Sequence, residues 1–131
     1  MRRLTSAIVA LSLLIGGAAH ATMSPLGGRI TTFASLLATP LLGRAKPSYL
    51  QILNCVNASA ALAYVQMFDA AATSGITVGT TPNNGWIPVP VGTFSFNVFA
   101  NFTNGIVLAA TLTPTGNGAP SAGLVCSMTA Q

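Results

Sequence analysis

The sequence predicts an all-β protein, an antiparallel, jelly-roll-like β-sandwich of six to eight short strands with an extended N-terminal arm. The chain has 131 residues, enough for one domain and too few for two ordinary ones. From Ser48 onward, short apolar runs alternate with turn residues, and no helical period is evident. The run 93–102 alternates cleanly, with Phe94, Phe96 and Val98 on one face.

The predicted strands follow one another closely between Gly, Pro and Asn turns. Segment 86–92 contains Pro88 and Pro90, which restrict it to a sheet edge. An Asn-Gly turn precedes the run from Ile106. The other predicted strands are 49–57, 62–70, 75–81, 93–102, 104–114 and 122–130. Such short strands at close spacing are typical of a sandwich or small barrel.

The predicted core of the sandwich takes one apolar set from each strand, and Trp86 is interpreted as a lid over it. Its members are Leu50, Ile52, Val56, Tyr64, Val65, Met67, Phe68, Val78, Ile87, Phe94, Phe96, Val98, Ile106, Leu108, Leu112, Leu124 and Val125.

Residues 22–47 are interpreted as an extended apolar arm that precedes the sandwich domain of residues 48–131. Several Gly and Pro residues interrupt this segment, and a short helix over 31–38 would end at Pro40. Its apolar side chains would be a liability on an isolated monomer, so we expect them to mediate assembly. These arm residues are Phe33, Leu36, Leu37, Leu41 and Leu42.

Residues 1–21 have the three-part layout of a secretory signal. Arg2 and Arg3 are followed by an apolar run, which closes with the small-x-small sequence Ala19-His20-Ala21. The run is too short to predict a membrane span, and we expect no stable membrane span once this segment is removed. An uncleaved apolar arm is the alternative.

The composition favours a protein that assembles with other molecules. Charged residues make up only 5% of the chain, against about 25% in ordinary soluble proteins. From Pro47 to Gln131 the only charged side chain is Asp69, so little repulsion keeps copies apart. A homo-oligomer is therefore expected. Nucleic acid is rejected as the main partner, because the body of the protein lacks phosphate-neutralising cations.

Cys55 and Cys126 are disulfide candidates, which an oxidising compartment would allow to pair. Two buried free thiols are the alternative. Because chain ends tend to lie close together, we expect the two cysteines on neighbouring strands. Alternation places Cys55 on one face with Leu53, opposite Ile52 and Val56.

The inventory of reactive side chains argues against an enzyme. Beyond residue 21 the chain has no His, no Glu and one Asp, which leaves no nucleophile–base pair, carboxylate dyad or His-rich metal site. We predict no catalytic residue, no metal and no cofactor. Asp69, at the end of a predicted strand, is interpreted as a structural turn residue that accepts backbone N–H bonds and shapes the exit from that strand. The alternatives are a Ca²⁺ contact and a catalytic role.

The ordered motifs NASAALAYVQMFDAA, VGTTPNNGWIPVPVG and NGIVLAATLTPTGNGAPSAGLVCSM carry a resemblance. They resemble a small β-sandwich domain of tailed-bacteriophage virion proteins of the capsid-decoration, neck and tail-fibre type. The likeness covers residues 48–131. The matching positions are Asn57, Tyr64, Phe68, Asp69, Gly79, Thr80, Pro82, Pro88, Gly105, Ile106 and Ala109.

The resemblance implies a non-enzymatic structural role in a virion, as a minor capsid, decoration or tail-associated component. Its partners would be copies of itself and other virion proteins. The export-like N-terminus and the cysteine pair depart from the family pattern. They support an alternative, an exported bacterial surface or periplasmic module for binding or assembly.

Overall fold

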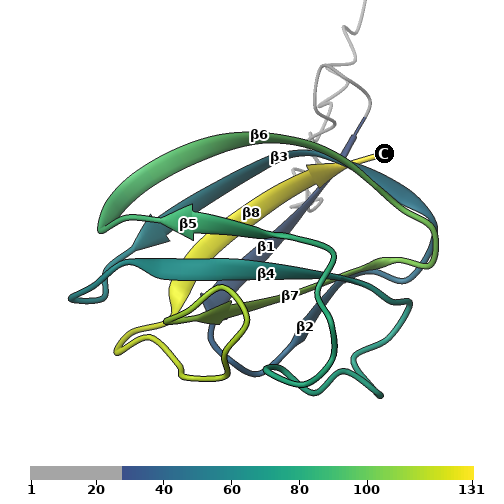
Figure 1. Cartoon of the computed structure of the whole chain (residues 1–131). Coiled ribbons are helices and arrows are strands. Elements are labelled where there is room, and N and C mark those ends of the chain that lie inside the picture. The colour runs from purple at the N-terminus through teal and green to yellow at the C-terminus, as the bar shows by residue number, and fades with distance from the viewer. Residues whose placement is uncertain (1–27) are drawn as a thin grey trace, which may run out of the picture.

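The computed structural model describes residues 28–131, and these form eight strands without any helix (Figure 1). The strands make two four-stranded antiparallel sheets. They are β1 (Arg29–Leu36), β2 (Leu41–Arg44), β3 (Ser48–Asn57), β4 (Ala63–Asp69), β5 (Trp86–Val89), β6 (Gly92–Phe102), β7 (Ile106–Thr111) and β8 (Leu124–Ala130). The expected segment 1–21, and the start of the expected arm, lie outside the described residues.

The strand order is that of a jelly roll. One sheet has the order β1-β8-β3-β6 and the other β2-β7-β4-β5. The first four strands therefore pair with the last four in nested fashion, β4 with β5, β3 with β6, β2 with β7 and β1 with β8. This double ribbon rolls up when β8 pairs with β3 and β7 with β4. The predicted jelly-roll-like sandwich is confirmed.

The core lies between the two sheets and follows the two-residue period of the strands. On β3, Leu53 and Cys55 point inward, and on β4 the inward residues include Val65 and Met67. Leu124, Cys126, Met128 and Ala130 line the inner face of β8. The predicted core took Ile52 and Val56 from this strand, but the buried face is that of Leu53 and Cys55. Ile52 is half-buried and Val56 is 39% exposed.

Residues 29–44 differ from the expected extended arm, because they form the edge strands β1 and β2. Phe33 and Leu36 are buried in the core of their own chain, and Leu41 packs against it. Leu37 is half-buried and Leu42 is exposed. The sandwich therefore begins well before residue 48, and neither Phe33 nor Leu36 is available for contacts with another molecule.

The strand predicted over residues 75–81 is wrong. The segment forms turns, in which the amides of Ile76, Thr80 and Thr81 donate to carbonyls three or four residues earlier. Gly75 and Gly79 both have positive φ, near 88° and 87°, which interrupts an extended strand. Val78 from this loop covers a second apolar cluster on the outer face of the β2-β7-β4-β5 sheet, formed by Phe68, Val107 and Ala109.

Several predicted core residues lie on the surface. Val56, Leu112 and Val125 are 39%, 43% and 48% exposed, and Phe94 is 36% exposed. Val56 and Val125 alternate with inward-facing cysteines, which places them on the outer face of their sheet. Trp86, predicted to cover the core, is 45% exposed and packs edge-on against Tyr64 instead.

Candidate functional site

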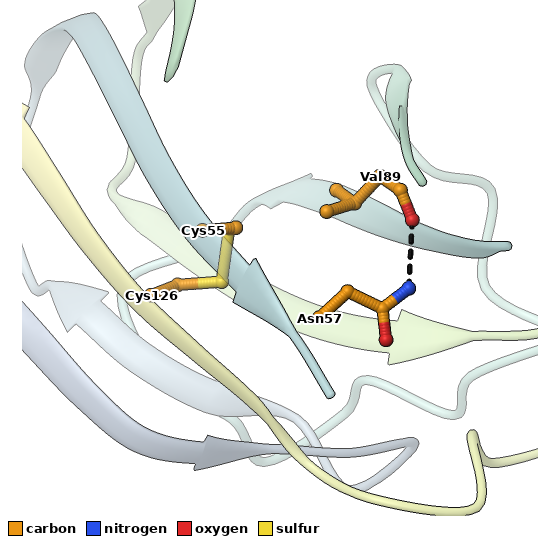
Figure 2. The surroundings of a disulfide bond; sticks show 4 residues. All are labelled: Cys55, Asn57, Val89 and Cys126. Atoms are coloured by element: carbon orange, nitrogen blue, oxygen red, sulfur yellow. Dashed lines mark hydrogen bonds between the residues drawn. A yellow bond between two sulfur atoms is a disulfide. The ribbon is translucent and has the colours of Figure 1, made fainter. Parts of the chain in front are cut away.

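Cys55 and Cys126 form a disulfide between the two central strands of one sheet, as predicted (Figure 2). The two residues are direct partners in the β3–β8 register, and their Cα atoms are 4.2 Å apart. Both cysteines are only 1% exposed. The bond lies within the core and joins positions 71 residues apart in sequence, so its role is structural.

Asn57, two residues beyond Cys55, links the two sheets by hydrogen bonds. Its side-chain amide donates to the carbonyls of Val89 on β5 and Ala61, at 2.8 and 2.9 Å (Figure 2 shows the bond to Val89). Its Oδ1 accepts from the amide and the hydroxyl of Ser59. This buried side chain is 1% exposed and uses both its donors and its acceptor. It holds the end of β5 against the end of β3.

Asp69 ends β4, and its carboxylate organises the turn between β6 and β7. Oδ2 accepts from the hydroxyl and amide of Thr103, at 2.6 and 3.0 Å. Oδ1 accepts from the amides of Asn104 and Gly105, at 2.7 and 3.3 Å. The turn that Asp69 holds is therefore 34 to 36 residues away in sequence and not the exit from its own strand.

The same contacts change the acidity of Asp69. The Thr103 hydroxyl and the three amides stabilise the ionised form and lower the pKa of Asp69 from 3.8 to about 2, against a smaller opposing effect of desolvation. The carboxylate remains accessible to solvent. Among residues 28–131 there is no cluster of three His, Cys, Asp or Glu side chains that could hold a metal ion.

We predict a small loss of stability at acid pH that is due to Asp69. Because its pKa is depressed in the folded state, its stabilisation is complete above about pH 4 and is lost as the pH falls toward 2. Since the group is solvent-accessible, we expect the loss to stay below about 1 kcal/mol. With no other Asp or Glu side chain in the sequence, the protein should remain folded at pH 2. Urea unfolding measured from pH 6 to pH 2 tests this.

The control is Asp69→Asn, which keeps the shape of the side chain and removes its charge. This variant should be less stable than the parent at pH 6, and its stability should change little between pH 4 and pH 2. A parent protein that unfolds fully between pH 4 and pH 3 would contradict the prediction. So would an acid transition of unchanged size in the Asp69→Asn variant.

The basic side chains of the described region gather at the ends of β1 and β2. Arg29, Arg44 and Lys46 line a shallow cleft of about 460 Å³. The Arg44 guanidinium donates to the carbonyl of Ala130 at 2.6 Å and so ties β2 to the end of β8. Arg29 and Lys46 are exposed at the rim. These cations all lie between positions 29 and 46 of the sequence, and the fold keeps them at one end of the sandwich.

The exposed edge at β6 is the surface that sequence reasoning missed. We use "β6 edge" for residues 92–102, an 11-residue outer strand of the β1-β8-β3-β6 sheet (Figure 1). It contains no charged residue and no Pro, and only Phe102 is buried. Phe99 is 60% exposed, and Val91 just before the strand is 56% exposed. Phe94 and Phe96 stack, with ring centroids 6.2 Å apart.

The reason for this exposure is the short strand opposite. Phe96, Val98 and Ala100 face the core, but they are only partly buried. The facing sheet ends at β5, which has four residues, so it covers little of the eleven-residue β6. The strict alternation of 93–102 was visible in the sequence, whereas the absence of a covering partner was not.

Within residues 28–131 we find no helix of the length and apolarity that a membrane crossing requires. Comparison of the chain with protein-family models, with curated proteins and with solved structures finds no match.

Proposed function

We propose that the protein is a non-enzymatic structural component of a bacteriophage virion, a minor capsid, decoration or tail-associated protein that assembles through its uncharged surface. The observation that carries the proposal is a jelly roll with one carboxylate side chain and an exposed, charge-free β6 edge. Jelly rolls are frequent in viral capsid proteins, although the fold alone does not determine function. The resemblance in the motifs of residues 48–131 points the same way.

The surface chemistry supports assembly over a freely diffusing role. A soluble protein at high concentration depends on like charges to keep copies apart. Beyond Lys46 this chain carries only Asp69, whose charge is engaged by the β6–β7 turn. Trp86 on β5, Phe99 on β6 and Val91 just before β6 are exposed apolar side chains on or beside two edge strands. A surface of this kind favours burial against neighbouring subunits.

Purified particles provide the test. Phage induced from a host that carries this gene should be banded on a density gradient and washed with high salt. Mass spectrometry should then detect the protein at a fixed ratio to the major capsid protein, and labelled antibody should decorate the particle in electron micrographs. A protein present in the lysate but absent from washed particles would refute the virion role.

A second candidate is an exported bacterial surface or periplasmic module, which the Cys55–Cys126 disulfide favours. Disulfides persist in oxidising compartments and are rare in the cytosol. This candidate predicts a mature chain that starts at Thr22, recovered from the periplasm or the cell surface. Intact mass of the purified protein distinguishes the two candidates, because a virion component made in the cytosol would retain residues 1–21.

A further inference from the structure

The β6 edge has the properties of a strand-pairing surface. We propose that it pairs antiparallel with the β6 edge of a second copy of this chain and so joins two molecules in one continuous sheet. The inference deepens the proposed assembly role by naming its partner and contact strand. It can nevertheless be measured on the purified protein, without any virion.

The other three edges of the sandwich carry features that oppose strand addition. β1 begins with Arg29 and has a register shift between Phe33 and Leu36. β2 and β5 have four residues each, β2 ending in Arg44 and β5 containing Pro88. Short strands, charges, bulges and prolines are the usual protections of an edge. The β6 edge has eleven residues and neither a charge nor a Pro. It also has a register shift, against β3 between Asn97 and Ala100, but residues 93–97 before it pair regularly and are uncharged.

The register of the sheet fixes which backbone groups of β6 face outward. The Cα distance of 4.2 Å between Cys55 and Cys126 fits a non-hydrogen-bonded antiparallel pair, for which about 4.5 Å is typical. The N–H and C=O of Cys55 therefore point toward β6, where Phe94 is the partner. By alternation, Thr93, Ser95 and Asn97 direct their N–H and C=O groups away from β3, into the open edge.

The ends of the regular segment define the register of the proposed pair. Gly92 and Phe99 have positive φ, 118° and 53°, so the uninterrupted ladder lies between them. A twofold axis at Ser95 would pair Thr93 of each copy with Asn97 of the other. All three outward residues of each copy would then donate and accept across the interface. Phe94 would lie opposite Phe96 of the second copy, which extends the apolar inner face.

The second copy is favoured over other occupants by charge and symmetry. An edge that pairs with itself antiparallel satisfies both molecules with one surface. No charged residue lies on β6 to repel its copy. Residues 22–27, just before β1 in the sequence, contain Pro25, which lacks the N–H that a ladder needs.

Sedimentation velocity of the purified chain over a concentration series tests the proposal, with Ser95→Pro as the key variant. Proline removes an outward N–H and places its ring in the open edge, a position that edge strands tolerate. The matched control is Thr32→Pro. Thr32 is exposed on the opposite edge, and its N–H points away from β8, since its neighbour Phe33 pairs with Cys126.

We expect a concentration-dependent dimer of the parent, a dimer dissociation constant at least tenfold higher in Ser95→Pro, and an unchanged one in Thr32→Pro. Retention of the disulfide and of a cooperative melt in both variants shows that each is folded. A strictly monomeric parent overturns the inference, and so does a dimer that Ser95→Pro leaves intact. If particles contain the protein and Ser95→Pro still enters them as a dimer, the inference fails and the virion role stands.

Discussion

Replacing Cys55 and Cys126 together by alanine should lower the free energy of unfolding by about 4 kcal/mol. The bond closes a long loop, with a sequence separation of 71, and the chain-entropy model gives about this value for such a loop. For a domain of this size the loss should lower the melting temperature by more than about 10 °C. Urea unfolding of the double variant and of the parent measures the difference.

The location of the disulfide adds to this expectation. β3 and β8 are the two inner strands of their sheet, and their pairing closes the jelly roll. Both cysteines are buried, so each alanine also removes sulfur contacts from the core. Parent protein with both cysteines kept as free thiols by a reducing agent, unfolded in parallel, separates the two contributions. The reduced protein loses the cross-link but keeps both sulfur atoms.

A matched control lies one residue away on the same strands. Val56 and Val125 are direct partners in the β3–β8 register, and their side chains lie on the outer face. The double replacement by alanine should cost below about 1 kcal/mol, the range of strand preferences at exposed positions. If the cysteine and valine pairs cost the same, the disulfide is not a main source of stability in this fold.

The cysteine pairing was predictable because two local regularities agreed. The two-residue period placed Cys55 with Leu53, and the tendency of chain ends to meet placed the two cysteine strands side by side. The prediction still named the wrong strand as the first, since β1 and β2 precede β3. The neighbour of β8 on its other side is β1.

β1 was hidden by its own irregularity. Phe33 points inward, and regular alternation would then send Leu36 to the outer face. The register shift between these two residues brings Leu36 inward as well, which breaks the period that sequence reasoning depends on. Gly and Pro residues around the strands further obscured the pattern. The apolar side chains of this segment looked exposed because their own β-sheet was not recognised.

For the candidate sites too, the local sequence predicted the type of residue or element but not its partners. The turn function of Asp69 followed from residue type, but its partners, Thr103 to Gly105, belong to another part of the chain. The β6 edge was readable as a strand, whereas its position in the sheet order depends on every other strand. The local pattern of a single sequence does not show which distant segments lie in contact.

Asn57→Ala should lower the free energy of unfolding by about 3 kcal/mol, the second largest effect that we expect. The buried carbonyl of Val89 and the amide of Ser59 would lose their Asn57 partner. Each buried polar group left without a hydrogen bond costs about 1–3 kcal/mol. The carbonyl of Ala61 keeps the Ser59 hydroxyl as a donor, which limits the loss. Thermal and urea unfolding measure the change.

Two further variants separate the hydrogen bonds of Asn57 from its volume. Asn54→Ala, on the exposed outer face of the same strand, should change stability by no more than about 0.5 kcal/mol. Asn57→Asp keeps the volume but replaces the amide donor by a buried charge, so it should be less stable than Asn57→Ala at pH 7. Below about pH 4 the neutral acid can again donate to Val89, and part of the stability should return. An Asn57→Asp variant as stable as the parent at pH 7 would show that the amide does not hold β5 to β3. In that case the closure of the sandwich would depend on apolar packing alone.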